Sequence, residues 1–431
     1  MTVEIAEDSM ERIVALSDDQ NVDGYNHAIG PCRFFLRLLG TWPDPYGNVD
    51  SWTTSARCLV ITATMFLFAT ISQTVKMALS YKDLNLVTEI LTNCNIPTTI
   101  ATIKIASIWY YRWVLRDLVR QIIEDWEMSH DRHESAIMWR SAKISRIFSI
   151  GCMFMTEGTL LTQCVVGLFR PISYAFKTDL NQSIEWPLYM KGSFPYDVQS
   201  SPNYELSILG QLLSNVFAST SFSSADSFFI VLMFHLIGQL SILKLTILDL
   251  PSKIENSDDR SKFIDRFAFV HMRHNRLWRF SMAIEESFNT MFLIQMIPCI
   301  FALCTQGYQL IMIMDADNVS LMELIFMIYF LVLFLFTIFT YCYVTEILRC
   351  KSLELSYAVY DCDWTILPAK EARILLLILV RTQHPFEITA GKFASFSLPF
   401  YCRILKTSAG YLSMLLAVKK RSEQVASKVV L

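Results

Sequence analysis

The sequence predicts an all-α membrane protein: seven transmembrane helices, a cytoplasmic N-terminus, an extracellular C-terminus and a cytoplasmic layer of helices. Hydrophobic residues make up 53% of the 431 residues and charged residues 18%, below the roughly 25% charge of soluble domains. Apolar stretches of about 18 or more residues recur along the chain, and each indicates a helix that crosses the bilayer. Lysine and arginine gather in alternate connecting segments, which indicates the direction of each crossing.

The first three expected spans carry few charges. Span 1 is uncharged over residues 58–75, span 2 covers about 90–111, and span 3 covers about 147–169. Span 2 contains Lys104 and span 3 contains Glu157 as their single charged residues. A charged side chain at the bilayer centre costs about 3 kcal/mol or more, so we expect both to face protein or water.

The fourth apolar stretch, 206–243, is long enough to be one helix or two. One helix would be about 57 Å long, whereas "SFSSADSF" around Asp226 could form a turn between two spans. With a single helix, 25 lysines and arginines fall on one side of the membrane and nine on the other. The glycosylation sequons at Asn181 and Asn318 then also share a side. We therefore expect one long helix that projects into the cytoplasm.

The last three spans follow a basic segment. Residues 244–286 are amphipathic and predict a helix in the cytoplasm. Span 5 is uncharged over 287–314, with Pro298 as a kink site, span 6 is uncharged over 324–345, and span 7 covers about 393–418.

Span 7 carries Arg403 and Lys406 in its first half. The three charged residues inside spans 2, 3 and 4 invite two interpretations. The depths of Lys104 and Asp226 suggest that they pair near the middle of the membrane, which would be a structural role. In the alternative interpretation, Glu157 or Lys104 contacts a ligand or takes part in a conformational switch.

No set of residues predicts catalysis, a metal site or a cofactor. The histidine pairs His130 with His133 and His271 with His274 have a spacing that can bind metal, but no carboxylate or cysteine completes a set of ligands. Solvated loop histidines are the simpler interpretation. The formal net charge of −3 predicts no nucleic-acid partner.

One face of span 7 mixes polar and apolar residues. Thr407, Tyr411, Met414 and Val418 are spaced by four, three and four positions and share one side of a helix. Such a stripe suits a pore wall with an apolar constriction. Ordinary helix packing would produce it as well.

Distinctive motifs lie near both ends of the chain. Residues 357–416 contain Tyr360 with Trp364, the "LLLILVRTQ" segment, "TAGKF" and "ILKTS" followed by Tyr411. The segment "FFLRLLGTWP" at 34–43 precedes the first span. Together these motifs resemble those of insect odorant receptors, and the style of the sequence suggests a hymenopteran member.

The resemblance implies an odorant-gated, non-selective cation channel in the plasma membrane of olfactory sensory neurons. Its implied partners are a small volatile odorant, a co-receptor that completes a heterotetramer, and membrane lipid. Because the co-receptor's long loop between spans 4 and 5 is missing, the resemblance implies a tuning subunit. It divides the chain into a cytoplasmic N-terminal segment (1–51), spans 1–6 with the ligand pocket (52–350), a cytoplasmic anchor (351–392), a pore-lining helix (393–418) and an extracellular tail (419–431).

The resemblance also implies site residues. The anchor helix would be 365–383, and the pore helix would begin near Ser397. Met414 and Val418 would form the constriction beside Tyr411 and Thr407, with Ala417 where the co-receptor has a polar glutamine. Pocket residues in the outer halves of the spans, each of which could instead serve helix packing, would be Cys152, Thr156, Thr159, Phe217, Phe222, Tyr329 and Phe330.

Two other receptor classes are less compatible with these patterns. A gustatory-type channel usually has the signature "TYxxxxxQF", whereas "YLSMLLAV" follows Gly410 here. A G-protein-coupled receptor would have the opposite charge sidedness, and its "DRH"-like fragment at 131–133 lies before a span instead of after one.

Overall fold

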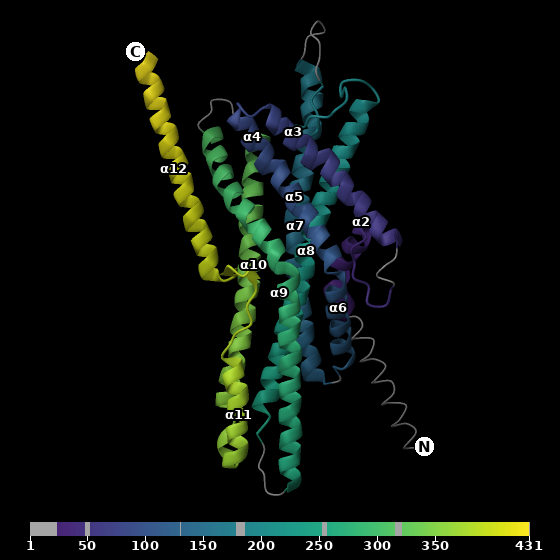
Figure 1. Ribbon diagram of the computed structural model, residues 1–431, viewed down its shortest axis with the longest axis vertical. Coiled ribbons are helices and arrows are strands. Elements are labelled where there is room, and N and C mark those ends of the chain that lie inside the picture. Colours follow the sequence, from purple (N-terminus) through teal and green to yellow (C-terminus); the bar gives the residue numbers. More distant parts are fainter. Residues whose placement is uncertain are drawn as a thin grey trace.

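In a computed structural model, the protein forms an elongated bundle of long helices (Figure 1). In the part of the chain that the structure describes, one two-stranded hairpin is the only sheet. The helical segment 24–39 packs beside the bundle and buries Ile29, Leu36 and Leu39. The described residues are 24–47, 52–129, 131–177, 186–251, 257–314 and 321–430.

The first two passes each contain a short π-helical turn. The first pass joins α2 (Trp52–Met65), η1 (Phe66–Ile71) and α3 (Ser72–Leu79), and the second joins α4 (Leu84–Ile90), η2 (Leu91–Asn95) and α5 (Ile96–Tyr110). The side-chain amide of Asn95 donates to the Thr70 carbonyl and to the Thr74 hydroxyl, both at 3.2 Å. These bonds join the second irregular turn to the first and to the start of α3. Helix α6 (Arg112–Glu127) follows directly.

Four helices of more than 40 residues are about twice as long as a bilayer crossing requires. They are α7 (Arg132–Lys177), α8 (Asn203–Leu248), α9 (Ser257–Met314) and α10 (Leu321–Asp361). The 46 residues of α8 make it about 69 Å long, compared with a hydrocarbon core of roughly 30 Å. The fourth apolar stretch is therefore a single helix, as the sequence predicted. The amphipathic segment after it is also helical and continues into span 5 as α9.

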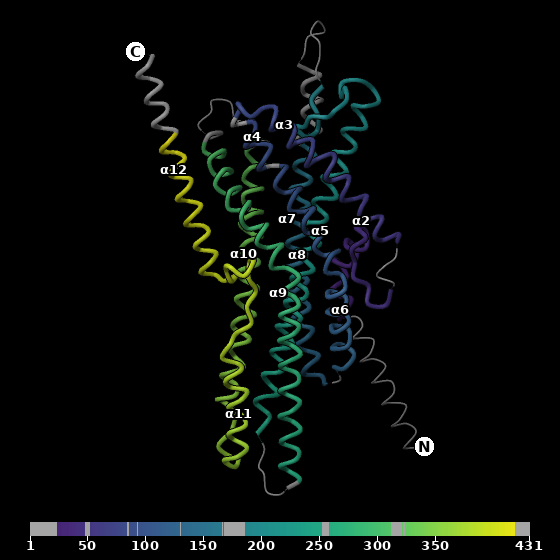
Figure 2. Tube along the Cα trace, in the orientation of Figure 1, coloured from purple at the N-terminus to yellow at the C-terminus, as the bar shows by residue number. Residues whose placement is uncertain are grey.

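The last third of the chain folds back along α10 and then leaves the bundle axis. Figure 2 shows α11 beside the lower part of α10, and α12 starting higher up and sloping away from the bundle. The domain boundary expected at 350 lies inside α10, because one helix continues to Asp361. Helix α12 also continues through the expected tail to Val430. The elements are η3 (Trp364–Ile366), α11 (Ala369–Thr382), β1 (Thr389–Ala390), β2 (Ala394–Ser395) and α12 (Leu398–Val430).

Helix α8 lies at the centre of the bundle. Helices α5, α7, α9 and α10 all pack against it, and nearly every residue from Ala218 to Leu243 is buried. Its serine-rich part has small side chains that let neighbouring backbones approach closely. The hydroxyls of Ser149 and Ser227 donate to each other's backbone carbonyls at 3.5 and 3.3 Å. The polar run that could have formed a turn is therefore a packing surface.

Length and apolar composition alone identify fewer spans than the sequence predicted. Within the described residues, four helices qualify: Trp52–Leu79, Asn203–Leu248, Asp258–Ile311 and Leu324–Ile366. The passes through α5, α7 and α12 run alongside them. The sequon asparagines Asn181 and Asn318 lie outside the described residues.

Candidate ligand cavity and buried charge network

A small cavity that is open on one side lies between η2, α5, α7, α8 and α10. Helical spacing brings its wall together, because residues three or four positions apart share a face. The lining residues are Cys94, Pro97, Thr98, Thr156, Thr159, Leu160, Gln163, Asn215, Ala218, Ser219, Phe222, Phe330, Leu333, Phe334 and Thr337.

The cavity wall combines aromatic rings with hydroxyl groups. Phe330 and Phe334 are one turn apart on α10 and meet edge to face, with ring centroids 4.9 Å apart. The hydroxyls of Thr98, Thr156 and Thr337 each donate to a backbone carbonyl of their own helix, at 2.8 to 2.9 Å. Because these donors are used, their hydroxyl oxygens face a ligand mainly as acceptors. The wall therefore suits a small, mostly apolar molecule that carries a hydroxyl group.

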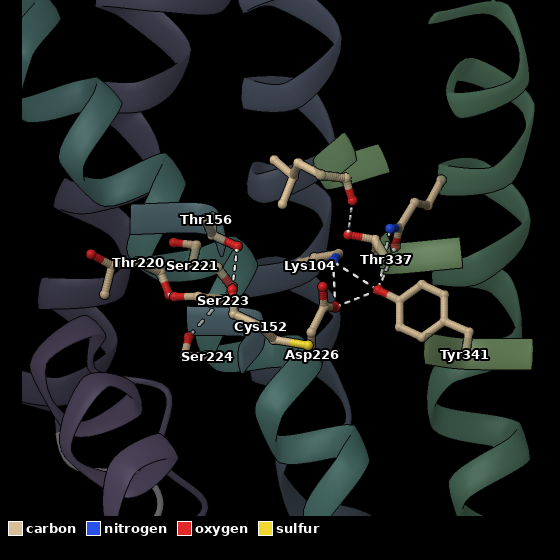
Figure 3. A network of polar contacts seen from close by, with 12 residues as sticks. Lys104, Cys152, Thr156, Thr220, Ser221, Ser223, Ser224, Asp226, Thr337 and Tyr341 are labelled. Atoms are coloured by element: carbon tan, nitrogen blue, oxygen red, sulfur yellow. Dashed lines mark hydrogen bonds and ion pairs between the residues drawn. The ribbon is translucent and has the colours of Figure 1, made fainter. Parts of the chain in front are cut away.

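A charged network lies next to the cavity. Lys104 forms a fully buried ion pair with Asp226. The Tyr341 hydroxyl donates to the same carboxylate and accepts from Lys104 Nζ and Gln295 Nε2, both at 3.2 Å. Figure 3 shows the first three side chains converging between their helices. The network thus connects α5, α8, α9 and α10, and it contains the pair that the depths of Lys104 and Asp226 suggested.

Phe222 separates the cavity from this network. Its ring lines the cavity, and Lys104 Nζ lies 3.4 Å from the ring centroid. A desolvated cation over an aromatic face gains about 2 kcal/mol. Movement of the Phe222 ring would therefore change the interaction energy of the Lys104 ammonium group.

Four of the seven residues predicted for the pocket line the cavity. They are Thr156, Thr159, Phe222 and Phe330, and whether they bind a ligand stays a prediction. The other three are not part of the wall. Cys152 is buried close to the ion pair (Figure 3), Phe217 packs against the core, and the Tyr329 hydroxyl donates to a backbone carbonyl of α7 at 3.3 Å.

Sequence reasoning missed several residues of the cavity and of the network. Phe334 lies one turn after the predicted Phe330, and Tyr341 lies three turns after it, so helical spacing was an available signal. Gln295 is an amide within an uncharged span, which is a signal of internal hydrogen bonding. Asn215 and Thr98 gave no signal that distinguishes them from other polar residues of their helices.

Glu157, the charged residue of span 3, does not line the cavity. The Glu157 carboxylate accepts a hydrogen bond from the Ser223 hydroxyl at 3.3 Å. This contact joins α7 to α8, and a role of Glu157 in ligand contact or switching stays a prediction.

The hairpin before α12 is fixed to α9. Gly391 has φ of 60° and donates its N–H to the Asn289 carbonyl at 2.9 Å. A side chain there would place its Cβ 2.4 Å from Leu293, so only glycine fits without a shift. Glu285 accepts from both the backbone N–H and the hydroxyl of Thr389. Movement of α9 would therefore be passed to the segment that leads into α12.

The predicted pore stripe lies on an uncovered face of α12. Tyr411, Met414 and Val418 are 53%, 65% and 58% exposed, and Thr407 and Ala417 are exposed as well. Exposure of apolar side chains in a single chain is expected where a pore or a neighbouring subunit completes the surface.

The other face of α12 holds it to the bundle. Ile404 and Ser408 are buried, and the Cys304 thiol donates to the Ser408 carbonyl at 3.6 Å. Leu412 packs over Gly307 of α9. Helix α12 is thus anchored along one side only.

The histidine pairs do not gather into a larger cluster in the described part of the chain. No group of three or more histidine, cysteine, aspartate or glutamate side chains is placed there to hold a metal ion. His130 lies outside the described residues. His274 corrects the expectation of solvated loop histidines: it is buried on α9, because that segment is an amphipathic helix packed on the bundle. His271 is exposed and hydrogen-bonds with the Asn275 side chain at 3.1 Å.

Known proteins share both the sequence pattern and the fold. The family model described as 7tm odorant receptor matches residues 86–409. Odorant receptor 13a of Drosophila melanogaster is 22% identical over 408 residues, covering 89% of this chain and 94% of that receptor. Odorant receptor 82a of the same species is 26% identical over 237 residues, covering 54% of this chain and 58% of that receptor.

Solved structures have the same architecture. The insect olfactory receptor OR5 from Machilis hrabei, in complex with eugenol, matches with a TM-score of 0.77 and 17% identity, covering 91% of this chain and 99% of that one. A second structure of the same receptor matches with a TM-score of 0.75. The matched family is that of odorant receptors, which leaves no support for the gustatory-type and G-protein-coupled alternatives. The chain therefore belongs to the insect odorant receptor family and has its seven-span membrane fold.

Proposed function

We propose that the chain is the odorant-tuned subunit of a heterotetrameric, non-selective cation channel that it forms with a co-receptor. Two observations carry this proposal: the cavity between α5, α7, α8 and α10, and the uncovered polar–apolar stripe of α12. Membership of the odorant receptor family supports it. The receptor from Machilis hrabei, which has a similar fold, is known in complex with eugenol.

Opening would follow from ligand preference for one cavity shape. A ligand shifts an equilibrium only by its difference in affinity for the two states. Occupation of the cavity would favour the state in which Met414 and Val418 move apart around the pore. The plasma membrane of olfactory sensory neurons is the proposed location, and the bundle end that holds α6 and α11 is the proposed cytoplasmic end.

Currents from cells that carry this chain with a co-receptor would test the proposal. We expect dose-dependent currents with some members of a panel of volatiles, and little or no current when this chain is expressed alone. Because the cavity presents acceptors, ring-containing alcohols should activate at lower concentration than their methyl ethers. A robust response from the chain alone would contradict the tuning-subunit assignment, and silence towards the whole panel at normal surface expression would contradict odorant gating.

A further inference from the structure

We propose that the buried ion pair is a positioning element that couples the cavity to the start of α12; this inference rests on the proposed odorant-gated channel. Side-chain contacts run without a gap from Phe222 in the cavity wall, through Lys104, Asp226 and Tyr341, to Phe396 just before α12. The links run from α8 to Lys104 of α5, back to Asp226 one turn further along α8, across to Tyr341 of α10, and on to the segment before α12. The series thus extends from the ligand cavity to the start of the pore helix.

At the cavity end, the link is the ammonium group of Lys104. It lies 3.4 Å from the centroid of the Phe222 ring and is bound on its other side by Asp226 and Tyr341. A ligand that displaces this ring alters the surroundings of a cation that is fully buried. The polar partners of Lys104 must then change position with it.

At the pore end, the link is the ring of Tyr341. Its centroid lies 4.8 Å from that of Phe292 on α9 and 5.9 Å from that of Phe396. Phe396 is buried between the hairpin and α12, 5.2 Å from Phe292 and 5.9 Å from Phe400 in the first turn of α12. A shift of Tyr341 is therefore felt where the pore helix begins.

The chemistry of the network favours a role in coupling the cavity to the pore over a role in helix packing alone. Well-packed apolar residues hold helices together at least as well as a buried ion pair does. The Tyr341 hydroxyl, in contrast, is hydrogen-bonded to Asp226, Lys104 and Gln295 at the same time, which fixes the orientation of all three side chains. Movement of one partner therefore changes the hydrogen bonds of the others. Two sites are coupled when an element between them has two conformations and each site shifts the equilibrium between those conformations. The hydrogen-bond network around Tyr341 can serve as that element for the ligand cavity and the pore.

Removal of this hydroxyl is the sharpest test. Tyr341→Phe keeps the ring contacts to Phe292 and Phe396 but removes the shared hydrogen bonds. Tyr343→Phe is the matched control, because Tyr343 lies two residues along α10 and stacks on Phe148 and Phe339 outside the network. Concentration–response curves for several agonists and single-channel open probabilities would be recorded with the co-receptor present.

We expect Tyr341→Phe to shift the half-maximal concentration of every agonist by a common factor of about five or more. The rank order of agonists should stay unchanged, and Tyr343→Phe should stay within about twofold of the wild type. Gln295→Leu, a second and independent variant, should move the curves in the same direction because it removes a donor to the same hydroxyl.

Three results would overturn the inference. Equal behaviour of Tyr341→Phe and Tyr343→Phe would remove the hydroxyl from coupling. A changed rank order would make Tyr341 a ligand-contacting residue instead. Lower surface expression with unchanged half-maximal concentration and open probability would show a merely structural role. A wild-type chain that responds to nothing would overturn the proposed function itself, and this inference with it.

Discussion

At the residue scale, the pairing of Lys104 with Asp226 is the most consequential contact. Both side chains are buried, and within the described residues neither forms an ion pair with any other side chain. An unpaired buried charge is strongly unfavourable, whereas removal of both charges leaves mainly a packing change. Stability should therefore respond very differently to single and double substitution.

We expect Lys104→Met alone to destabilise the protein by about 3–5 kcal/mol, because it strands the Asp226 carboxylate. The double variant with Asp226→Asn should regain much of that loss. Thermal melting in detergent and surface expression would measure both effects. Lys191→Met is a matched control, since Lys191 pairs with Glu89 at 2.7 Å on the exposed surface, where such pairs contribute about 0–1 kcal/mol. A double variant no more stable than Lys104→Met would argue against the pair.

The sequence was sufficient to suggest this pair but not its surroundings. Two opposite charges at similar depth in apolar spans leave few ways to be stabilised, which is why Lys104 and Asp226 could be matched in advance. Tyr341 and Gln295 carry no charge, and their meeting depends on the rotation of α9 and α10, which composition does not determine. The cavity residues on α7 and α10 were found only in part for the same reason.

At the element scale, α12 is the helix whose packing is incomplete in a single chain. Its buried side contacts α9 and α10, whereas Met414 and Val418 on the other face are largely exposed. An apolar ring in a pore resists wetting and so keeps the pore closed. A polar substitution in that ring should favour hydration.

We expect Met414→Ser or Val418→Ser to raise the basal current, in recordings without ligand from cells with the co-receptor. Leu416→Ser is the control, because position 416 lies about 200° around the helix from both residues and is partly buried. It should leave basal current unchanged while lowering expression. If basal current, conductance and block are all unaltered in the first two variants, neither residue lines the pore.

Helices were predictable to different degrees. The single helix α8 followed from charge balance and sequon placement, which are long-range constraints on the whole chain. The hairpin Thr389–Ser395 gave no strand signal, because two-residue strands lack a period and this one is held by Glu285 and Asn289 of α9. The continuation of α10 to Asp361 was missed because the loss of hydropathy after the span does not end a helix.

At the scale of the whole molecule, orientation remains the property on which the proposed channel depends. Basic residues are concentrated at the bundle end that holds α6, the first half of α9, and α11. Positive residues favour the cytoplasm, so this end should face it together with the N-terminus.

An epitope tag at the N-terminus should therefore stain only after the cells are permeabilised, whereas a tag at the C-terminus should stain on intact cells. Glycan mapping at Asn181 and Asn318 provides a second readout, with both positions expected on the outside if modified. Staining of the N-terminal tag on intact cells would reverse the topology and exclude the proposed channel.

The central place of α8 also bears on how such a receptor acquires a new ligand preference during evolution. A replacement on α8 disturbs neighbours on several sides at once, since close-packed interiors tolerate changes in volume poorly. Leu160 of α7 and Leu333 of α10 border the cavity on more peripheral helices. Drift in odour tuning should therefore accumulate on those outer walls, while the middle helix preserves the scaffold that every variant needs in order to fold.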